Sequence, residues 1–325
     1  MLPTTTERAL PVPPPLAMIV ASVDEIAVGC RMITLRPAEP ALLPATEAGA
    51  HVGVHLPNGV LRQYSLLEAE AAPEAYRIAV KRDPASRGGS AYIFDHLAIG
   101  DHVQVDAPRN NFPLDAQAAH SVLIAGGIGI TPIMAMIRTL EASGRGWTLH
   151  YAARAREEAA FASALASYPN VHLHFDAEQA GAVLPIAAIV EAAPEDAHLY
   201  CCGPALMLAA FETAAAAIAP DRVHVEYFVA THEAAIDGQF LVELARSRLE
   251  LVVAPGQSIL EAIREAGVEV VSSCEEGVCG ACETRVLAGV PDHRDAILSE
   301  RERAANTTMF ICCSGCKGDR LVLDR

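Results

Sequence analysis

The sequence predicts a multidomain chain that joins an antiparallel β-barrel, a doubly wound α/β domain and a small α+β domain of the β-grasp type. Three observations support this prediction. Short alternating strands come first, strands and helices alternate after residue 121, and a hairpin, a helix and a cysteine-rich loop follow near the end. A length of 325 residues agrees with two or three domains of roughly 100 to 200 residues each.

The N-terminal third reads as short strands separated by Gly, Pro, Asn and Asp. The expected strands cover residues 18–23, 32–36, 51–56, 62–66, 76–81 and 102–107. This spacing is typical of a β-barrel or sandwich, and we place that domain at residues 16–116. Residues 1–15 contain five prolines and few large apolar groups, so they predict a flexible arm.

The period of the pattern changes in the middle of the chain. Apolar strands are expected at residues 122–125, 149–153, 171–175, 199–202 and 223–228, and helices at 133–141, 157–167, 185–192 and 204–219. Alternating strands and helices indicate a parallel, doubly wound sheet, here assigned to residues 117–228.

A polar stretch at residues 229–238 is the expected linker to the last domain, residues 239–325. A hairpin over residues 240–246 and 249–254 comes first. The helix that follows begins at Ser258, and Glu261 three residues later completes a capping box.

Composition limits the classes of function. The formal net charge of -16 argues against binding to nucleic acid or to anionic membranes, and it leaves room for a basic docking partner. No stretch of about 18 uninterrupted apolar residues is present. Nine cysteines in so long a chain do not form a disulfide scaffold, and the N-terminus lacks a signal peptide, so we expect a cytoplasmic location.

Cysteines near the C-terminus have the spacing of the ligands of a plant-type 2Fe-2S cluster. Cys274, Cys279 and Cys282 form a C-x4-C-x2-C run, and Cys312 is the distant fourth cysteine. Gly277, Gly280 and Ala281 between them are small enough for the backbone to wrap around the cluster and to aim N–H groups at its sulfurs. We expect a short strand over residues 309–312 to deliver Cys312.

Other readings of the cysteines stay open at this point. Cys279 and Cys282 could pair with Cys313 and Cys316 in a structural zinc site, or Cys316 could replace Cys312 as the fourth ligand. With Cys312 as the ligand, Cys313 is expected to face away from it. Cys30, in a strand-like stretch, is interpreted as a small core residue.

A glycine-rich turn between a strand and a helix suggests a site for pyrophosphate. Gly127 and Gly129 precede Thr131, which can cap the helix, and Pro132, which suits its first turn. Free N–H groups and the helix dipole would then face an anion. The turn lacks the third glycine of the usual nucleotide-binding motif, because Pro132 occupies that position. The glycines could therefore serve only to pack the helix tightly against the strand.

Three further segments strengthen this interpretation. Cys202, Gly203 and Pro204 lie at another strand-to-helix turn, where such a sheet opens its ligand crevice. Upstream, Arg62, Tyr64 and Ser65 share one strand, with Arg62 and Tyr64 on the same face. The stretch from Arg87 through Gly88, Gly89 and Ser90 could cradle a phosphate, or be an ordinary surface loop.

Together these motifs resemble the FMN-containing, NADH-dependent reductases with a C-terminal plant-type ferredoxin domain, the phthalate dioxygenase reductase and vanillate O-demethylase reductase family. The resemblance implies an FMN-binding barrel, an NAD-binding α/β domain and a 2Fe-2S ferredoxin domain. It implies that Arg62 holds the FMN phosphate, Tyr64 lies against the isoalloxazine and Ser65 bonds near flavin N5.

The remaining roles also follow from the resemblance. Val80, Lys81 and Arg82 would line the flavin edge and ribityl chain, and Gly88, Gly89 and Ser90 would complete the phosphate site. The residues Gly127, Gly129, Thr131 and Pro132 would bind the NADH diphosphate. The nicotinamide pocket would be shaped by Cys202, Gly203 and Pro204, with Phe228 beside the flavin.

The resemblance also implies a function. NADH gives two electrons together and a 2Fe-2S cluster accepts one at a time, so flavin is the intermediary, with Tyr64, Ser65, Cys202 and Phe228 nearest the reacting atoms. The expected partner is a Rieske-type terminal oxygenase acting on aromatic compounds, and the reductase is expected to be a monomer.

Alternatives to this function are a reductase for a cytochrome P450 or other oxygenase, and a nucleotide- or zinc-binding module without turnover. FAD could replace FMN. Arg154 and Arg156 could favour NADPH by contacting a 2'-phosphate.

Overall fold

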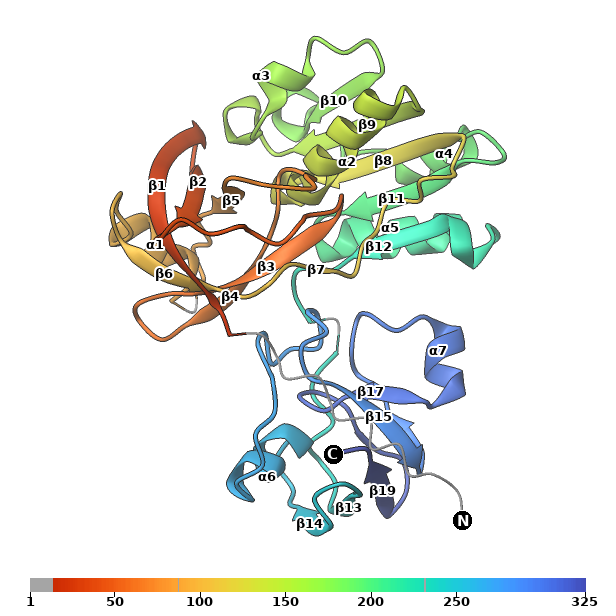
Figure 1. Ribbon diagram of the computed structural model, residues 1–325. Coiled ribbons are helices and arrows are strands. Elements are labelled where there is room, and N and C mark those ends of the chain that lie inside the picture. The colour runs from red at the N-terminus through yellow and green to blue at the C-terminus, as the bar shows by residue number, and fades with distance from the viewer. Residues whose placement is uncertain (1–13, 87, 231) are drawn as a thin grey trace.

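A computed structural model describes residues 14–86, 88–230 and 232–325 and contains three main sheets, one for each part of the sequence (Figure 1). All but two residues of the predicted N-terminal arm lie outside the described residues. The first strand begins at Leu16.

The first sheet is antiparallel, with the order β4-β3-β6-β1-β2-β5. Its strands are β1 (Leu16–Ala27), β2 (Cys30–Pro37), β3 (Ala50–His55), β4 (Leu61–Ser65), β5 (Tyr76–Lys81) and β6 (His102–Val105). A bridge between Leu66 and Ile78 joins the two ends of the sheet. The sequence analysis missed helix α1 (Ser90–Asp95) and the short strand β7 (Arg109–Asn110), which pairs with β3.

The second sheet is parallel, with the order β10-β9-β8-β11-β12, as the alternating pattern predicted. Its elements are β8 (His120–Gly126), α2 (Ile130–Ser143), β9 (Gly146–Ala153), α3 (Ala162–Leu165), β10 (Val171–Phe175), α4 (Ile186–Glu191), β11 (His198–Cys202), α5 (Ala205–Ala215) and β12 (Val223–Glu226). Alternate residues of β8 enter two cores: Leu123 packs with α2, and Ile124 with α4 and α5. Helices therefore cover both faces.

The third sheet is mixed, with the order β14-β13-β19-β15-β17. Its strands are β13 (Phe240–Leu244), β14 (Leu249–Val253), β15 (Glu283–Ala288), β17 (Thr308–Phe310) and β19 (Arg320–Leu323), and α6 (Ile259–Glu265) packs beside it. The predicted capping box is confirmed, because Glu261 N–H donates to Ser258 Oγ at 3.2 Å. A second capping box at Ser299 opens α7 (Glu300–Ala305).

The first two sheets share one hydrophobic core. Cys30 and Ala79 of the first sheet pack with Ile130 and Tyr151 of the second, which confirms Cys30 as a core residue. At the same junction the Lys81 ammonium lies 3.0 Å from the Glu158 carboxylate. The first two domains, which carry the motifs expected to bind flavin and nucleotide, therefore pack against each other through a shared core.

Part of the predicted linker packs on the third sheet. Ala235 N–H donates to Cys313 O at 2.8 Å, and Gly256 N–H donates to Ile236 O at 2.7 Å. Among the described residues, no helix combines the length and the apolar character needed to cross a bilayer.

We expect Ser258→Ala to lower the free energy of unfolding of the third sheet by about 1 kcal/mol, because the first turn of α6 loses its side-chain acceptor. The change is measured by urea unfolding, in which the loss of visible absorbance from the expected 2Fe-2S cluster reports the unfolding of this domain. Ser247→Ala, in the exposed turn between β13 and β14, is the control, and equal midpoints for the two variants would contradict the capping argument.

Candidate functional site

Four cysteine thiols of the third domain converge in two pairs. Cys274 lies within hydrogen-bonding reach of Cys279, and Cys282 within reach of Cys312. Charge interactions link Cys274 to Cys282 and to Cys312 across the pairs. Two thiolates for each of two irons is the arrangement that a 2Fe-2S core needs, so these residues fit such a cluster.

Backbone N–H groups around the loop point at sulfur. Cys274 N–H donates to Cys279 Sγ at 3.4 Å, and Glu276 N–H donates to Cys274 Sγ at 3.4 Å. Donation by the Cys274 thiol lowers the pKa of Cys279 to about 7, although burial acts in the opposite direction. Gly277 and Gly280 have φ of 73° and 79°, the left-handed conformation that lets the loop curl in this way.

Cys316, one of the two other cysteines of this region, lies apart from these pairs. Cys316 is half-buried in β18 (Gly315–Cys316), near Gly318 and Asp319, and no other cysteine acts on its pKa. Among the described residues, no three His, Cys, Asp or Glu side chains are placed to hold one metal ion. The pairing of Cys282 with Cys312 rather than with Cys316 favours Cys312 as the fourth ligand.

Two expectations about this region are wrong. Strand β17 ends at Phe310, so Cys312 lies in the turn after it rather than on the strand. The Cys313 thiol does not face away, since it interacts with that of Cys312. A turn reverses the chain within a few residues, so strand alternation does not apply there.

The phosphate-binding motifs of the first domain lie side by side, as predicted. A Cβ built on Gly89 would lie 2.7 Å from Arg62 Cγ, so only glycine lets the loop approach β4 this closely. Gly88 has φ of 88° and accepts a hydrogen bond from Asn58 Nδ2 at 2.9 Å. Ser90 follows at the start of α1, while Arg87 lies outside the described residues. An arginine beside a glycine-rich turn is a combination of groups that can bind a phosphate.

Tyr64 and Ser65 have different surroundings. Tyr64 packs partly against the core of the first sheet, and burial raises its pKa. Ser65 is buried, and its hydroxyl, like the Gln63 carbonyl, has no hydrogen-bond partner within the described ranges. Buried polar groups normally have partners, so these two fit a bound polar molecule such as a flavin.

The side chains expected along the flavin edge, those of Val80, Lys81 and Arg82, are buried or paired with acidic residues. Val80 is buried in the core of the first sheet, so it can offer only backbone groups to a ligand. Lys81 is paired with Glu158 of the second domain, and Arg82 with Asp95 at 2.9 Å.

The two predicted nucleotide turns touch each other at the carboxyl edge of the parallel sheet. A Cβ on Gly129 would lie 2.2 Å from Cys202 O, and one on Gly126 2.6 Å from Pro204 Cδ. Gly203 is equally restricted by Met207 Sδ at 2.7 Å. These glycines allow the close approach, and Gly127 has φ of 54°. The expected close packing of helix against strand is therefore present, and the nucleotide site at this turn stays a prediction.

The expected cap of α2 is wrong. The helix begins at Ile130 with Gly129 as its N-cap, and no side chain caps it. Thr131 lies inside the first turn and donates from Oγ1 to Ile128 O at 2.9 Å. Pro132 is in the same first turn, where the absence of an N–H costs no helical hydrogen bond.

Cys202 has a partner that the sequence analysis did not identify. Glu226 on β12 is opposite Cys202 on β11, and Cys202 Sγ lies 3.9 Å from Glu226 Oε2. Burial raises the pKa of Glu226 to about 8, and it also raises that of Cys202. Strand β12 ends at Glu226, so Phe228, 40% exposed, lies in the loop beyond the carboxyl edge.

The cysteine loop rests on the first sheet. Gln63 Nε2 on β4 donates to Ser273 Oγ, and a Cβ on Gly280 would lie 3.3 Å from Asn111 Nδ2. The flavin strand and the cluster loop are therefore in contact. Sequence alone gave no sign of this, since more than two hundred residues separate Gln63 from Ser273.

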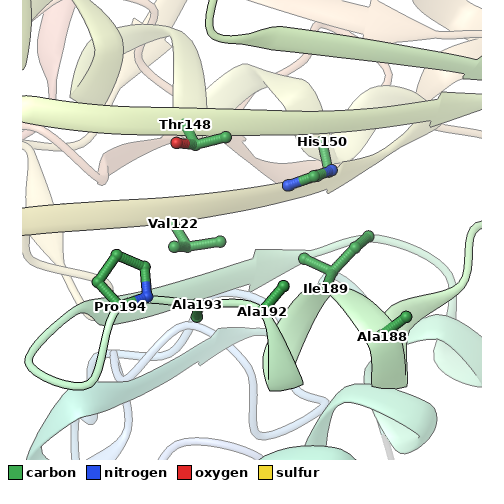
Figure 2. A pocket seen from close by; sticks show the side chains of 8 residues that line it. All are labelled: Val122, Thr148, His150, Ala188, Ile189, Ala192, Ala193 and Pro194. Atoms are coloured by element: carbon green, nitrogen blue, oxygen red, sulfur yellow. The ribbon is translucent and has the colours of Figure 1, made fainter.

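A pocket of about 250 Å³ lies elsewhere, between α4 and strands β8 and β9 (Figure 2). Val122, Thr148 and His150 line one side of it, and Ile189 lies on the other. Burial and the neighbouring His172 lower the pKa of His150 to about 4. None of the predicted site residues lines this pocket.

Comparison with known proteins agrees with the geometry. Residues 242–317 match the 2Fe-2S iron-sulfur cluster binding domain. The chain is 53% identical to the phenoxybenzoate dioxygenase subunit beta of Ectopseudomonas oleovorans, over 89% of this chain and 90% of that protein. It is 44% identical to the vanillate O-demethylase oxidoreductase of Pseudomonas sp. (strain HR199 / DSM 7063), over 88% and 92%.

Two solved structures match nearly the whole length of this chain. Phthalate dioxygenase reductase, described as modular for electron transfer from pyridine nucleotides to [2Fe-2S], matches 95% of this chain and 98% of its own, at 39% identity and TM-score 0.70. An intact type IV self-sufficient cytochrome P450 monooxygenase matches 96% of this chain at 39% identity and TM-score 0.88, and the matched part is 41% of that protein.

These identities, over nearly the whole chain, confirm the expected family and the iron-sulfur domain. The protein is an oxidoreductase that belongs to the phthalate dioxygenase reductase and vanillate O-demethylase reductase family.

Proposed function

We propose that this protein is the reductase component of a Rieske-type aromatic oxygenase system and passes electrons from NADH through FMN and a 2Fe-2S cluster to the oxygenase. The contact of the cysteine loop with flavin strand β4, through Gln63 and Ser273, is the observation that carries the proposal. When bound, NADH would supply a hydride and FMN would convert the electron pair into single electrons for a cluster held by the four cysteines.

The residues of this chain hold these groups in order. Arg62 binds the FMN phosphate together with Gly88, Gly89 and Ser90, while Tyr64 and Ser65 contact the flavin ring. The NADH diphosphate lies on the turn of Gly127, Gly129, Thr131 and Pro132. Its nicotinamide lies by Cys202, Gly203 and Pro204, with Phe228 beside the flavin. Cys274, Cys279, Cys282 and Cys312 hold the cluster.

The domain assignment follows the sheets. The bridge between Leu66 and Ile78 supports a closed FMN-binding barrel at residues 16–116. The parallel sheet supports an NAD-binding domain at residues 117–228, and the mixed sheet a β-grasp ferredoxin domain at 239–325 after a linker at 229–238. No two of the nine cysteines, all of which lie in the described residues, form a disulfide, and this supports a reducing, cytoplasmic location. We propose that the reductase is a monomer.

NADH is preferred to NADPH because Arg156, one of the two cations expected to contact a 2'-phosphate, is engaged. Arg156 donates from Nε and an Nη to the two carboxylate oxygens of Glu178, at 2.9 and 3.0 Å. A 2'-phosphate here would have to displace that carboxylate or lie beside its negative charge.

A second candidate acceptor is a cytochrome P450. It is favoured by the structural match of TM-score 0.88 to the self-sufficient cytochrome P450 monooxygenase. Reconstitution with a purified Rieske oxygenase and, separately, with a P450 distinguishes the two: NADH-dependent product with the Rieske protein supports our proposal, and product with the P450 alone would contradict it.

The cluster assignment gives a direct prediction. Cys312→Ser should lose most of the iron and acid-labile sulfide bound by the purified protein, because its pair with Cys282 is broken. Cys316→Ser, the matched control, should keep both. Retention by Cys312→Ser together with loss by Cys316→Ser would assign the fourth ligand to Cys316.

We expect Arg62→Ala to weaken FMN binding by roughly 10- to 100-fold, because the FMN phosphate would lose its charge-assisted hydrogen bonds with the Arg62 guanidinium. Fluorescence titration of the flavin-free protein measures the dissociation constant. Arg36→Ala, an exposed arginine on β2 of the same sheet, should leave it unchanged. Equal affinities for both variants would remove Arg62 from the phosphate site.

Glu226 should make stability depend on pH. Its native pKa of about 8 lies above the ordinary 4.5, so the folded state holds a proton that the unfolded state releases between these values. Stability therefore falls as pH rises through this window, by at most about 1.4 kcal/mol per pH unit. Glu226→Gln should lack this fall, as urea unfolding at pH 5.5, 7 and 8.5 would show.

Glu191→Gln, an exposed position at the end of α4, is the control for Glu226 and should follow the pH dependence of the unmodified protein. Parallel curves for Glu226→Gln and the unmodified protein would mean that Glu226 is ionised in the folded state at neutral pH.

A further inference from the structure

The pocket between α4 and strands β8 and β9 lies toward the amino end of the parallel sheet (Figure 2). Two of its lining residues, Val122 and Thr148, are the third residues of β8 and β9. The two nucleotide turns lie at the other end of the sheet, where β8 ends at Gly126 and β11 at Cys202. A ligand in this pocket would therefore be separate from the site proposed for NADH.

The pocket has room for one aromatic ring. Its volume is about 250 Å³, and an apolar protein cavity of about 150 Å³ can hold benzene. Pockets for drug-sized ligands usually start at about 300 Å³, so the ligand here must be smaller. Ala188 and Ala192 lie one turn apart on the same face of α4, and no long side chain enters the pocket from these two positions.

The strand side of the pocket carries two polar side chains. Thr148 Oγ1 lies 3.0 Å from His120 Nε2, and a hydroxyl engaged in this way keeps a further lone pair that can accept. The imidazole of His150 stacks on that of His172 with 4.8 Å between the ring centroids. Within the described part of the chain, neither nitrogen of His150 has a hydrogen-bond partner. The pocket therefore offers hydrogen-bonding groups that the protein itself does not use.

The lining of the pocket favours an uncharged ligand. None of the described residues that line it is Asp, Glu, Lys or Arg. Burial and the neighbouring His172 lower the pKa of His150 to about 4, so its imidazole is neutral at pH 7. A carboxylate or an ammonium group would find no opposite charge here, which makes its transfer from water costly. A neutral imidazole has one N–H donor and one acceptor nitrogen, so a hydroxyl group can pair with it in either role.

We propose that this pocket is a separate ligand site that binds a neutral phenol with a single ring. The ring would lie between Val122 and the alanine face of α4, and its hydroxyl would bond to His150 and Thr148. A phenol is preferred to a flexible alcohol because its rigid ring has no internal rotations to lose on binding. The inference does not rest on the proposed function, since none of the residues assigned to FMN, NADH or the cluster lines the pocket.

Titration of the complete, oxidised protein with 4-fluorophenol, followed by fluorine NMR, tests the inference. We expect saturable binding with a Kd on the order of 0.1 mM, which lies within the range that so small a ligand can reach. Fluorobenzene lacks the hydroxyl and should bind about tenfold more weakly, the value of one net hydrogen bond. The anion 4-fluorobenzoate should show no saturable shift, because no cationic side chain lines the pocket.

Three variants locate the site. Ala192→Leu fills the pocket and should abolish the saturable binding of both 4-fluorophenol and fluorobenzene. Ala187→Leu makes the same change at an exposed position of α4 that does not line the pocket, and it should bind both probes like the unmodified protein. His150→Phe keeps a flat ring without its polar atoms, so it should weaken binding of 4-fluorophenol about tenfold and leave the affinity for fluorobenzene unchanged.

Three results would overturn the inference. One is the absence of saturable binding of 4-fluorophenol to the unmodified protein, and another is equal affinity for 4-fluorophenol and fluorobenzene. The third is binding that persists in Ala192→Leu, since the probe would then occupy a different site. These titrations use neither NADH nor an electron acceptor, so their outcome is independent of whether the proposed electron transfer takes place.

Discussion

The arrangement of this protein depends on the contact between strand β4 and the cysteine loop of the third domain. Alternate side chains of β4 serve two purposes: Arg62 meets the glycine loop that fits a phosphate, and Gln63 bonds to Ser273 beside the first cluster cysteine. Because successive side chains of a strand point to opposite faces, one short strand contacts the glycine loop with one set of side chains and the cysteine loop with the other. A change in the register of β4 would exchange the two sets of side chains.

The nucleotide side depends on a second close approach. Gly129 lies against Cys202 O at a distance that no side chain would tolerate, so the two strand-to-helix turns form one edge of a crevice. The core shared by Cys30, Ala79 and Ile130 fixes this crevice relative to the first sheet. Glu226, half-buried beside Cys202, adds to this edge a carboxyl group whose pKa is raised to about 8 by burial.

The sequence predicted what depends on local chemistry. Cysteine spacing identified the four thiols that converge, Ser258 and Glu261 identified a capping box, and the period of apolar residues identified the parallel sheet. The sequence-based predictions were wrong where contacts with residues distant in the chain determine the local structure. Thr131 has the chemistry of a cap, yet packing of Gly129 on Cys202 starts the helix two residues earlier. Strand β7 is two residues long and exists through its pairing with β3.

The central claim is that electrons pass from flavin to cluster within one chain, across the docked face of the first sheet. It is tested most directly by the rate of cluster reduction after NADH is mixed anaerobically with the protein over a range of protein concentrations. Our account predicts a first-order rate that does not change with protein concentration. A rate proportional to protein concentration would show transfer between molecules and would contradict it.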